Sequence, residues 1–144
     1  MGPPALRRWT WLAYMRHNNI TDDDDLPRRA YLRGLFMEEL AKNSELDVNL
    51  DSGTVFLLGV LSMIEEIVGE SPSYLLRGLP LLSSESDRSA YSLLLRYAKL
   101  YEQRDPRLIL PDIRLSLDKK QVDNKYRMCA HETEAAISRM DTPV

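Results

Sequence analysis

The 144-residue sequence is poor in the side chains that build most metal and redox sites. Its single cysteine, Cys129, excludes an intramolecular disulfide and fits a reducing cytoplasm. Its two histidines, His17 and His131, stand far apart in the chain. His131 is followed by Glu132, as in the HExxH zinc helix, but Ala135 stands where the second histidine ligand is required. The six glycines are scattered and form no phosphate-binding loop.

A long apolar run and an excess of positive charge are also missing. The longest apolar stretch, residues 55–68, contains two glutamates and is shorter than the about 20 residues that cross a bilayer. The N-terminus lacks the pattern of a secretory signal. The net charge of −3 argues against nucleic-acid binding, and a DNA-binding regulator is therefore only a minor alternative. We expect a soluble cytoplasmic protein that binds neither membrane nor nucleic acid.

Helical periodicity dominates what is present. Apolar residues recur at three- and four-residue steps, and strand patterns are nearly absent. Helices are predicted over residues 5–16, 26–42, 51–68, 72–77 and 84–103, and from 118 onward. Pro27 suits a first helical turn, and Asp118 with Gln121 resembles a capping box. We predict an all-α chain with one domain over residues 1–144, a bundle of about five to six helices.

The third predicted helix is apolar on nearly every face, which is typical of the buried centre of a bundle. A buried strand over residues 55–61 is the competing interpretation, but the length of the run favours a helix.

Two further groups have chemical potential but favour ordinary structural roles. The run Asp22–Asp25 could hold a cation, yet four consecutive aspartates point in different directions and favour a solvated loop. Cys129 falls on the inner stripe of the last helix, and no neighbouring base in the sequence would activate it as a nucleophile. We expect it to be a core residue.

Two tryptophans and three arginines are the candidate partner-binding residues. Trp9 and Trp11 lie on roughly opposite faces of the first predicted helix, so one of them is exposed or packs against another part of the protein. Arg28, Arg29 and Arg33 cluster on the second predicted helix.

Five segments in order resemble bacterial proteins that join an EAL domain to an HDOD domain, the helical relative of HD phosphohydrolases that lacks their metal site. The segments are residues 6–9 (LRRW), 28–40 (RRAYLRGLFMEEL), 56–64 (FLLGVLSMI), 78–81 (GLPL) and 101–105 (YEQRD). The resemblance covers about residues 5–140 and implies an HD-like fold that is incomplete at its N-terminus. That gap would leave part of the third helix uncovered, as a surface for self-association or a partner.

The third helix carries the functional implication of this resemblance. Aligning Gly59 with the first glycine of the HD-type segment puts Ser62 and Met63 at the histidine and aspartate that bind metal. A hydroxyl and a thioether are poor substitutes for those ligands. The resemblance implies a protein that is not an enzyme and needs no cofactor, a signalling module related to cyclic di-GMP. It would bind a protein partner, an upstream EAL-type domain or a second copy. The alternative is an HD-type, metal-dependent phosphohydrolase with a divergent site.

Overall fold

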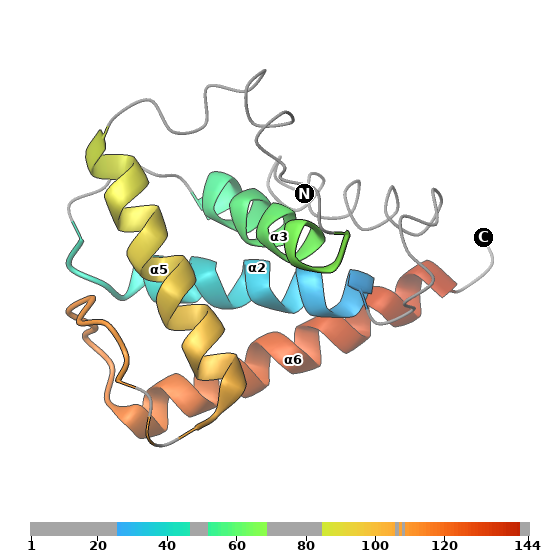
Figure 1. Ribbon diagram of the computed structural model, residues 1–144. Coiled ribbons are helices and arrows are strands. Elements are labelled where there is room, and N and C mark those ends of the chain that lie inside the picture. Colours follow the sequence, from blue (N-terminus) through green and yellow to red (C-terminus); the bar gives the residue numbers. More distant parts are fainter. Residues whose placement is uncertain (1–25, 47–51, 69–84, 106, 108, 142–144) are drawn as a thin grey trace.

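The computed structural model describes residues 26–46, 52–68, 85–105, 107 and 109–141 (Figure 1). They form the helices α2 (Leu26–Lys42), α3 (Ser52–Val68), α5 (Glu85–Gln103) and α6 (Lys119–Asp141). The all-α prediction is confirmed, including the helix over residues 55–61, and each helix begins within one residue of its predicted start. The helices predicted at 5–16 and 72–77, with Trp9 and Trp11, lie outside the described residues.

Helix α2 is the centre of the described fold, because α3, α5 and α6 all pack against it (Figure 1). Pro27 stands in its first turn, where a missing N–H breaks no helical hydrogen bond. Since α2 has neighbours on several sides, its buried residues include charged ones, Arg33 and Glu38.

The crossing of α2 and α3 depends on two glycines. A β-carbon on Gly34 would lie 2.8 Å from the carbonyl oxygen of Phe56. A β-carbon on Gly59 would lie 2.8 Å from the α-carbon of Gly34. The two backbones therefore approach each other more closely than a β-carbon at either position would allow.

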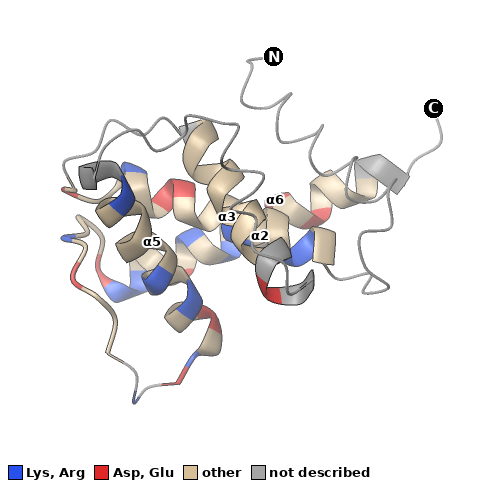
Figure 2. Cartoon of the chain, turned by 45° about the horizontal axis from the view of Figure 1, so that its top comes forward, with Lys and Arg blue, Asp and Glu red and all other residues tan. Residues whose placement is uncertain are grey.

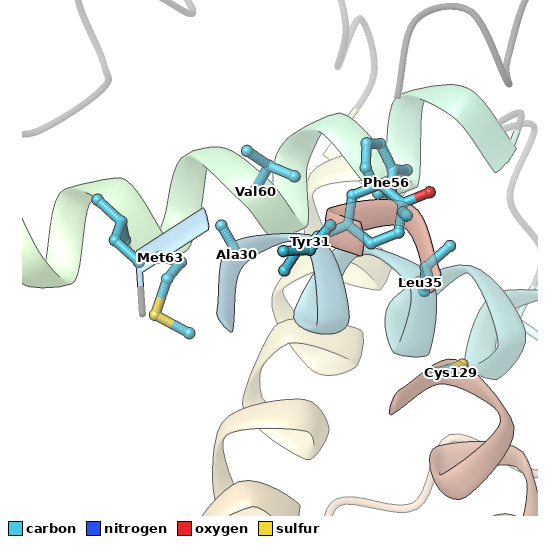
Figure 3. Close-up of a cluster of buried hydrophobic side chains, with 10 residues drawn as sticks. Ala30, Tyr31, Leu35, Phe56, Val60, Met63 and Cys129 are labelled. Carbon is cyan, nitrogen blue, oxygen red and sulfur yellow. The ribbon is translucent and has the colours of Figure 1, made fainter. Parts of the chain in front are cut away.

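Apolar side chains fill two adjoining clusters. The first joins α2, α3 and α6, and Tyr31 and Phe56 meet edge to face in it with ring centroids 5.3 Å apart (Figure 3). The second joins α2 to α5 and the start of α6, with Phe36 and Leu94 fully buried at its centre. Full burial of each such side chain contributes about 1.5–3 kcal/mol to stability.

Helix α3 does not present an uncovered apolar face over the residues whose side chains are described. Every residue from 53 to 63 is buried, and Leu57 is no more than 5% exposed. The prediction of an uncovered docking surface on α3 is therefore wrong for residues 53–63.

The segment between α5 and α6 returns the chain to the end of α2. Ser44 and Leu115 form an isolated antiparallel bridge, and the N–H of Ser116 donates to the carbonyl of Asn43 at 2.8 Å. The predicted capping box is confirmed. The N–H of Gln121 donates to Asp118 Oδ1 at 2.8 Å, and the N–H of Asp118 donates to Gln121 Oε1 at 2.9 Å.

Candidate functional site

A buried arginine links three helices. Arg33 of α2 is 3% exposed. Its Nε donates to Oε2 of Glu102 on α5 at 2.9 Å, and its Nη2 donates to Oε1 of the same carboxylate at 2.5 Å. Its Nη1 lies 3.0 Å from Oε2 of Glu66 on α3. This two-pronged geometry suits a planar guanidinium and could not be reproduced by a lysine.

Lys99 completes what we call the Arg33 network: Arg33, Glu66, Lys99 and Glu102. Lys99 Nζ lies 3.0 Å from Oε1 of Glu66, so each positive group faces a carboxylate and the network has no net charge. Burial alone would lower the pKa of Arg33, but the hydrogen bond to Glu102 and the nearby carboxylates raise it above its usual value. Burial would raise the pKa of Glu66, but Lys99 and Arg33 lower it below its usual value.

Ser62 adjoins this network, and its neighbour Met63 faces elsewhere. The Ser62 hydroxyl donates to the carbonyl of Gly59 at 2.7 Å and accepts from Arg33 Nη1 at 3.2 Å. Met63 is 2% exposed and belongs to the apolar cluster between α2 and α3 (Figure 3). The Ser62 hydroxyl is thus hydrogen-bonded to the positively charged Arg33, and the Met63 thioether packs among apolar side chains.

Among the residues that the structure describes, the remaining candidate ligands do not assemble into a metal centre. Within the described ranges, no group of three or more His, Cys, Asp or Glu side chains could hold an ion. His131 is exposed on α6, whereas His17 and the run Asp22–Asp25 lie outside the described residues. The network itself contains two carboxylates, and both already bind cationic side chains.

Cys129 is a core residue, as predicted. It is 4% exposed and packs in the first apolar cluster. Burial, followed by the negative charges of Glu39 and Glu132, raises the pKa of its thiol to about 12. The thiolate that nucleophilic chemistry needs is therefore scarce at neutral pH.

The structure separates the three arginines that the sequence groups together. Arg28 forms an ion pair with Glu134 of α6 at 2.5 Å, and its side chain is 40% exposed. Arg29 is exposed. Arg33 is enclosed by other helices, so it is not available to a partner and is corrected from a binding residue to an internal one.

The sequence did not point to a second feature, three tyrosines that line one cavity. Tyr97 and Tyr101 come from α5 and Tyr126 from α6. Helical spacing placed Tyr97 and Tyr101 on one apolar face, but no local signal brings Tyr126 beside them, because a 15-residue connection separates the two helices.

The comparisons with known proteins add no identification. No family model, curated protein or solved structure matches this chain. In the part that the structure describes, no helix combines the length and apolar character needed to cross a membrane. Acidic and basic residues are interspersed over the described helices (Figure 2).

Proposed function

We propose that this chain is a non-catalytic signalling module of the HDOD type, which acts by binding a protein partner. The observation that carries the proposal is the contact between Arg33 and Ser62, because Ser62 stands at a metal-binding position in the alignment with HD-type hydrolases. In this chain, that position is next to a guanidinium that already pairs with the carboxylates of Glu66 and Glu102.

Electrostatics support this interpretation. A divalent ion about 4 Å from the Arg33 guanidinium would meet roughly 8 kcal/mol of repulsion at an effective dielectric constant of 20. It could bind only by displacing a buried arginine and breaking that arginine's bonds to Glu102. The network thus provides, with a fixed side chain, the positive charge that an ion would otherwise supply. The HD-like fold and the link to cyclic di-GMP rest on the sequence resemblance.

A scaffold fixed in this way suits recognition of a partner. Arg33 joins α2 to α3 and α5, so the outer faces of these helices keep one arrangement before a partner arrives. A preorganised surface loses less conformational entropy on binding. The partner would be a protein of the cytoplasm, such as an EAL-type domain or a second copy of the chain.

Metal content separates this proposal from its rival, the divergent phosphohydrolase. The full chain is incubated with Mn²⁺, Fe²⁺ or Zn²⁺, passed through a desalting column and analysed by elemental mass spectrometry, and phosphoester turnover is measured in parallel. We expect metal far below one ion per chain and no turnover. Stoichiometric metal or hydrolysis would establish the rival.

Arg33→Ala is the matched variant for the electrostatic argument. It removes the guanidinium but keeps Glu66, Glu102 and Ser62. We expect Mn²⁺ to raise the Tm of this variant and to leave the wild-type Tm unchanged, because Glu102 then has no cationic partner in the network and Glu66 keeps only the partly exposed Lys99. An equal response of both proteins would contradict the role assigned to Arg33.

Light scattering and co-purification test the binding function itself. The chain is run alone and with an EAL-type domain encoded in the same genome. A stable complex with that domain, or a defined dimer, supports the module. A monomer that also fails to bind the domain counts against these two partners.

A further inference from the structure

A cavity of about 910 Å³ lies between the end of α5, the first turns of α6 and the segment that joins them. Its size is within the range of small-molecule sites, which span about 300–1,000 Å³. Seven of its twelve lining residues are aromatic or aliphatic, and five are charged. That composition is also typical of ligand sites, where polar groups fix the orientation of a ligand held by apolar contacts.

The tyrosines form the aromatic part of the lining. The rings of Tyr97 and Tyr101 are nearly parallel, 10° apart in orientation, with centroids separated by 6.5 Å. The Tyr126 ring follows at 5.1 Å from Tyr101. The Tyr101 hydroxyl donates to Asp123, which fixes its ring in place. Tyr101 and Tyr126 are partly exposed and offer aromatic surface to a planar ligand, whereas Tyr97 is 7% exposed and belongs to the apolar core.

Three cations line the same cavity: Arg104, Lys119 and Arg127. The guanidinium of Arg104 lies 5.4 Å from the centre of the Tyr126 ring, and its backbone adopts the left-handed conformation with φ 53°. Lys119 is the first residue of α6, where the helix dipole disfavours a positive charge. The lysine therefore does not stabilise the helix.

The acidic groups of the cavity already have partners. Asp123 accepts from Tyr101, and Asp105 forms an ion pair with Arg107 at 3.0 Å. Lys119 and Arg127 form no ion pair with the described part of the chain. Positive charge at the cavity is therefore only partly compensated.

The charge balance of the sequence supports the same conclusion. Residues 104–127 contain seven basic and four acidic residues, a net charge of +3 in a chain whose overall charge is −3. Three of these basic residues and two of the acidic ones line the cavity, which gives its lining a net charge of +1, and an anion is the complementary ligand.

We infer that this cavity binds a small aromatic anion, a planar ring bearing a phosphate, of the size of a nucleoside monophosphate. The ring would stack on Tyr101 and Tyr126, and the phosphate would meet Arg104, Lys119 and Arg127. This binding is separate from the proposed partner-binding function and does not depend on it.

Titration with 5′-AMP, followed through the NMR signals of the tyrosine rings, tests the inference. Adenosine supplies the ring without the anion, and inorganic phosphate supplies the anion without the ring. We expect 5′-AMP to shift the signals of Tyr97, Tyr101 and Tyr126 with a Kd below about 1 mM, and each half-ligand to bind at least about tenfold more weakly. Added salt should weaken the binding of 5′-AMP.

Exposed cations provide the variants. Lys119→Gln and Arg127→Gln should each weaken 5′-AMP binding by about fivefold, since a charged hydrogen bond at a partly exposed site is lost. Arg88→Gln, an exposed change near the other end of α5, is the control and should bind as the wild type does. Circular dichroism confirms that each variant is folded.

Three results would overturn the inference. The first is no tyrosine shift up to about 10 mM 5′-AMP. The second is equal binding of adenosine or phosphate alone, which would remove the requirement for a ring joined to an anion. The third is equal weakening by Arg88→Gln, which would mean nonspecific attraction to basic surface.

Discussion

The α-carbon of Gly34 lies in the space that a side chain at Gly59 would need, only 2.8 Å from the position of its β-carbon. The contact fixes how closely α2 and α3 approach, and the apolar cluster around Phe56 is built on that approach.

Gly59→Ala should therefore destabilise the protein by about 1–3 kcal/mol, the usual cost of overpacking a tight core. The sign of this change in the free energy of unfolding is informative, because alanine in a helix interior is otherwise favoured over glycine by about 1 kcal/mol. Urea unfolding measures the change. Ser92→Ala, at an exposed position of α5, is the control and should change stability by less than about 0.5 kcal/mol. If Gly59→Ala were more stable than the wild type, α2 and α3 could move apart without a loss of stability.

Local chemistry explains why the described helices could be predicted. Pro27 marks the first turn of α2, and Asp118 with Gln121 makes the reciprocal cap that starts α6. Such signals lie within a few residues of one another, so the sequence alone reveals them.

The candidate sites depend on contacts between distant residues, which local sequence patterns do not reveal. Helical periodicity assigns an arginine such as Arg33 to the polar face of its helix, together with Arg28 and Arg29. Its burial follows from the position of α2 between other helices, and its partner Glu102 stands 69 residues away. Tyr126 joins Tyr101 for the same kind of reason.

Arg33→Met should cost about 1–3 kcal/mol, because it removes two charged hydrogen bonds to the partly buried Glu102 and leaves Glu66 with Lys99 alone. Arg28→Met on the same helix is the matched control. Its ion pair with Glu134 is exposed, and such pairs contribute about 0–1 kcal/mol. Chemical denaturation compares the two variants. Similar losses would show that the Arg33 network is no more important for stability than a surface pair.

Glu66 should make stability depend on pH. Its pKa in the folded protein is below the usual value of 4.5, so the unfolded chain takes up its proton first as the pH falls. The contribution of Glu66 is complete above about pH 5 and declines as the pH falls below 4.5 toward its folded pKa. Urea unfolding between about pH 7 and pH 3 measures the slope.

Glu66→Gln should flatten that slope, because the amide does not titrate. Glu45→Gln replaces an exposed carboxylate outside the Arg33 network and is expected to keep the wild-type slope. If Glu66→Gln lost stability with acid as steeply as the wild type, another carboxylate would be responsible.

Cys129 should be nearly unreactive in the folded protein. With its pKa raised to about 12 by burial, the thiol is almost wholly protonated at pH 8, and its 4% exposure blocks access. A chromogenic disulfide reagent should react at least about 100-fold more slowly with the folded chain than with the chain in urea.

The raised pKa of Cys129 also predicts a loss of stability as the pH rises above the usual thiol value of 9.0, since the unfolded thiol ionises first. Cys129→Ala removes this alkaline dependence. Rapid labelling of the native chain at pH 8 would show that α6 opens locally, and the thiol would then report that motion.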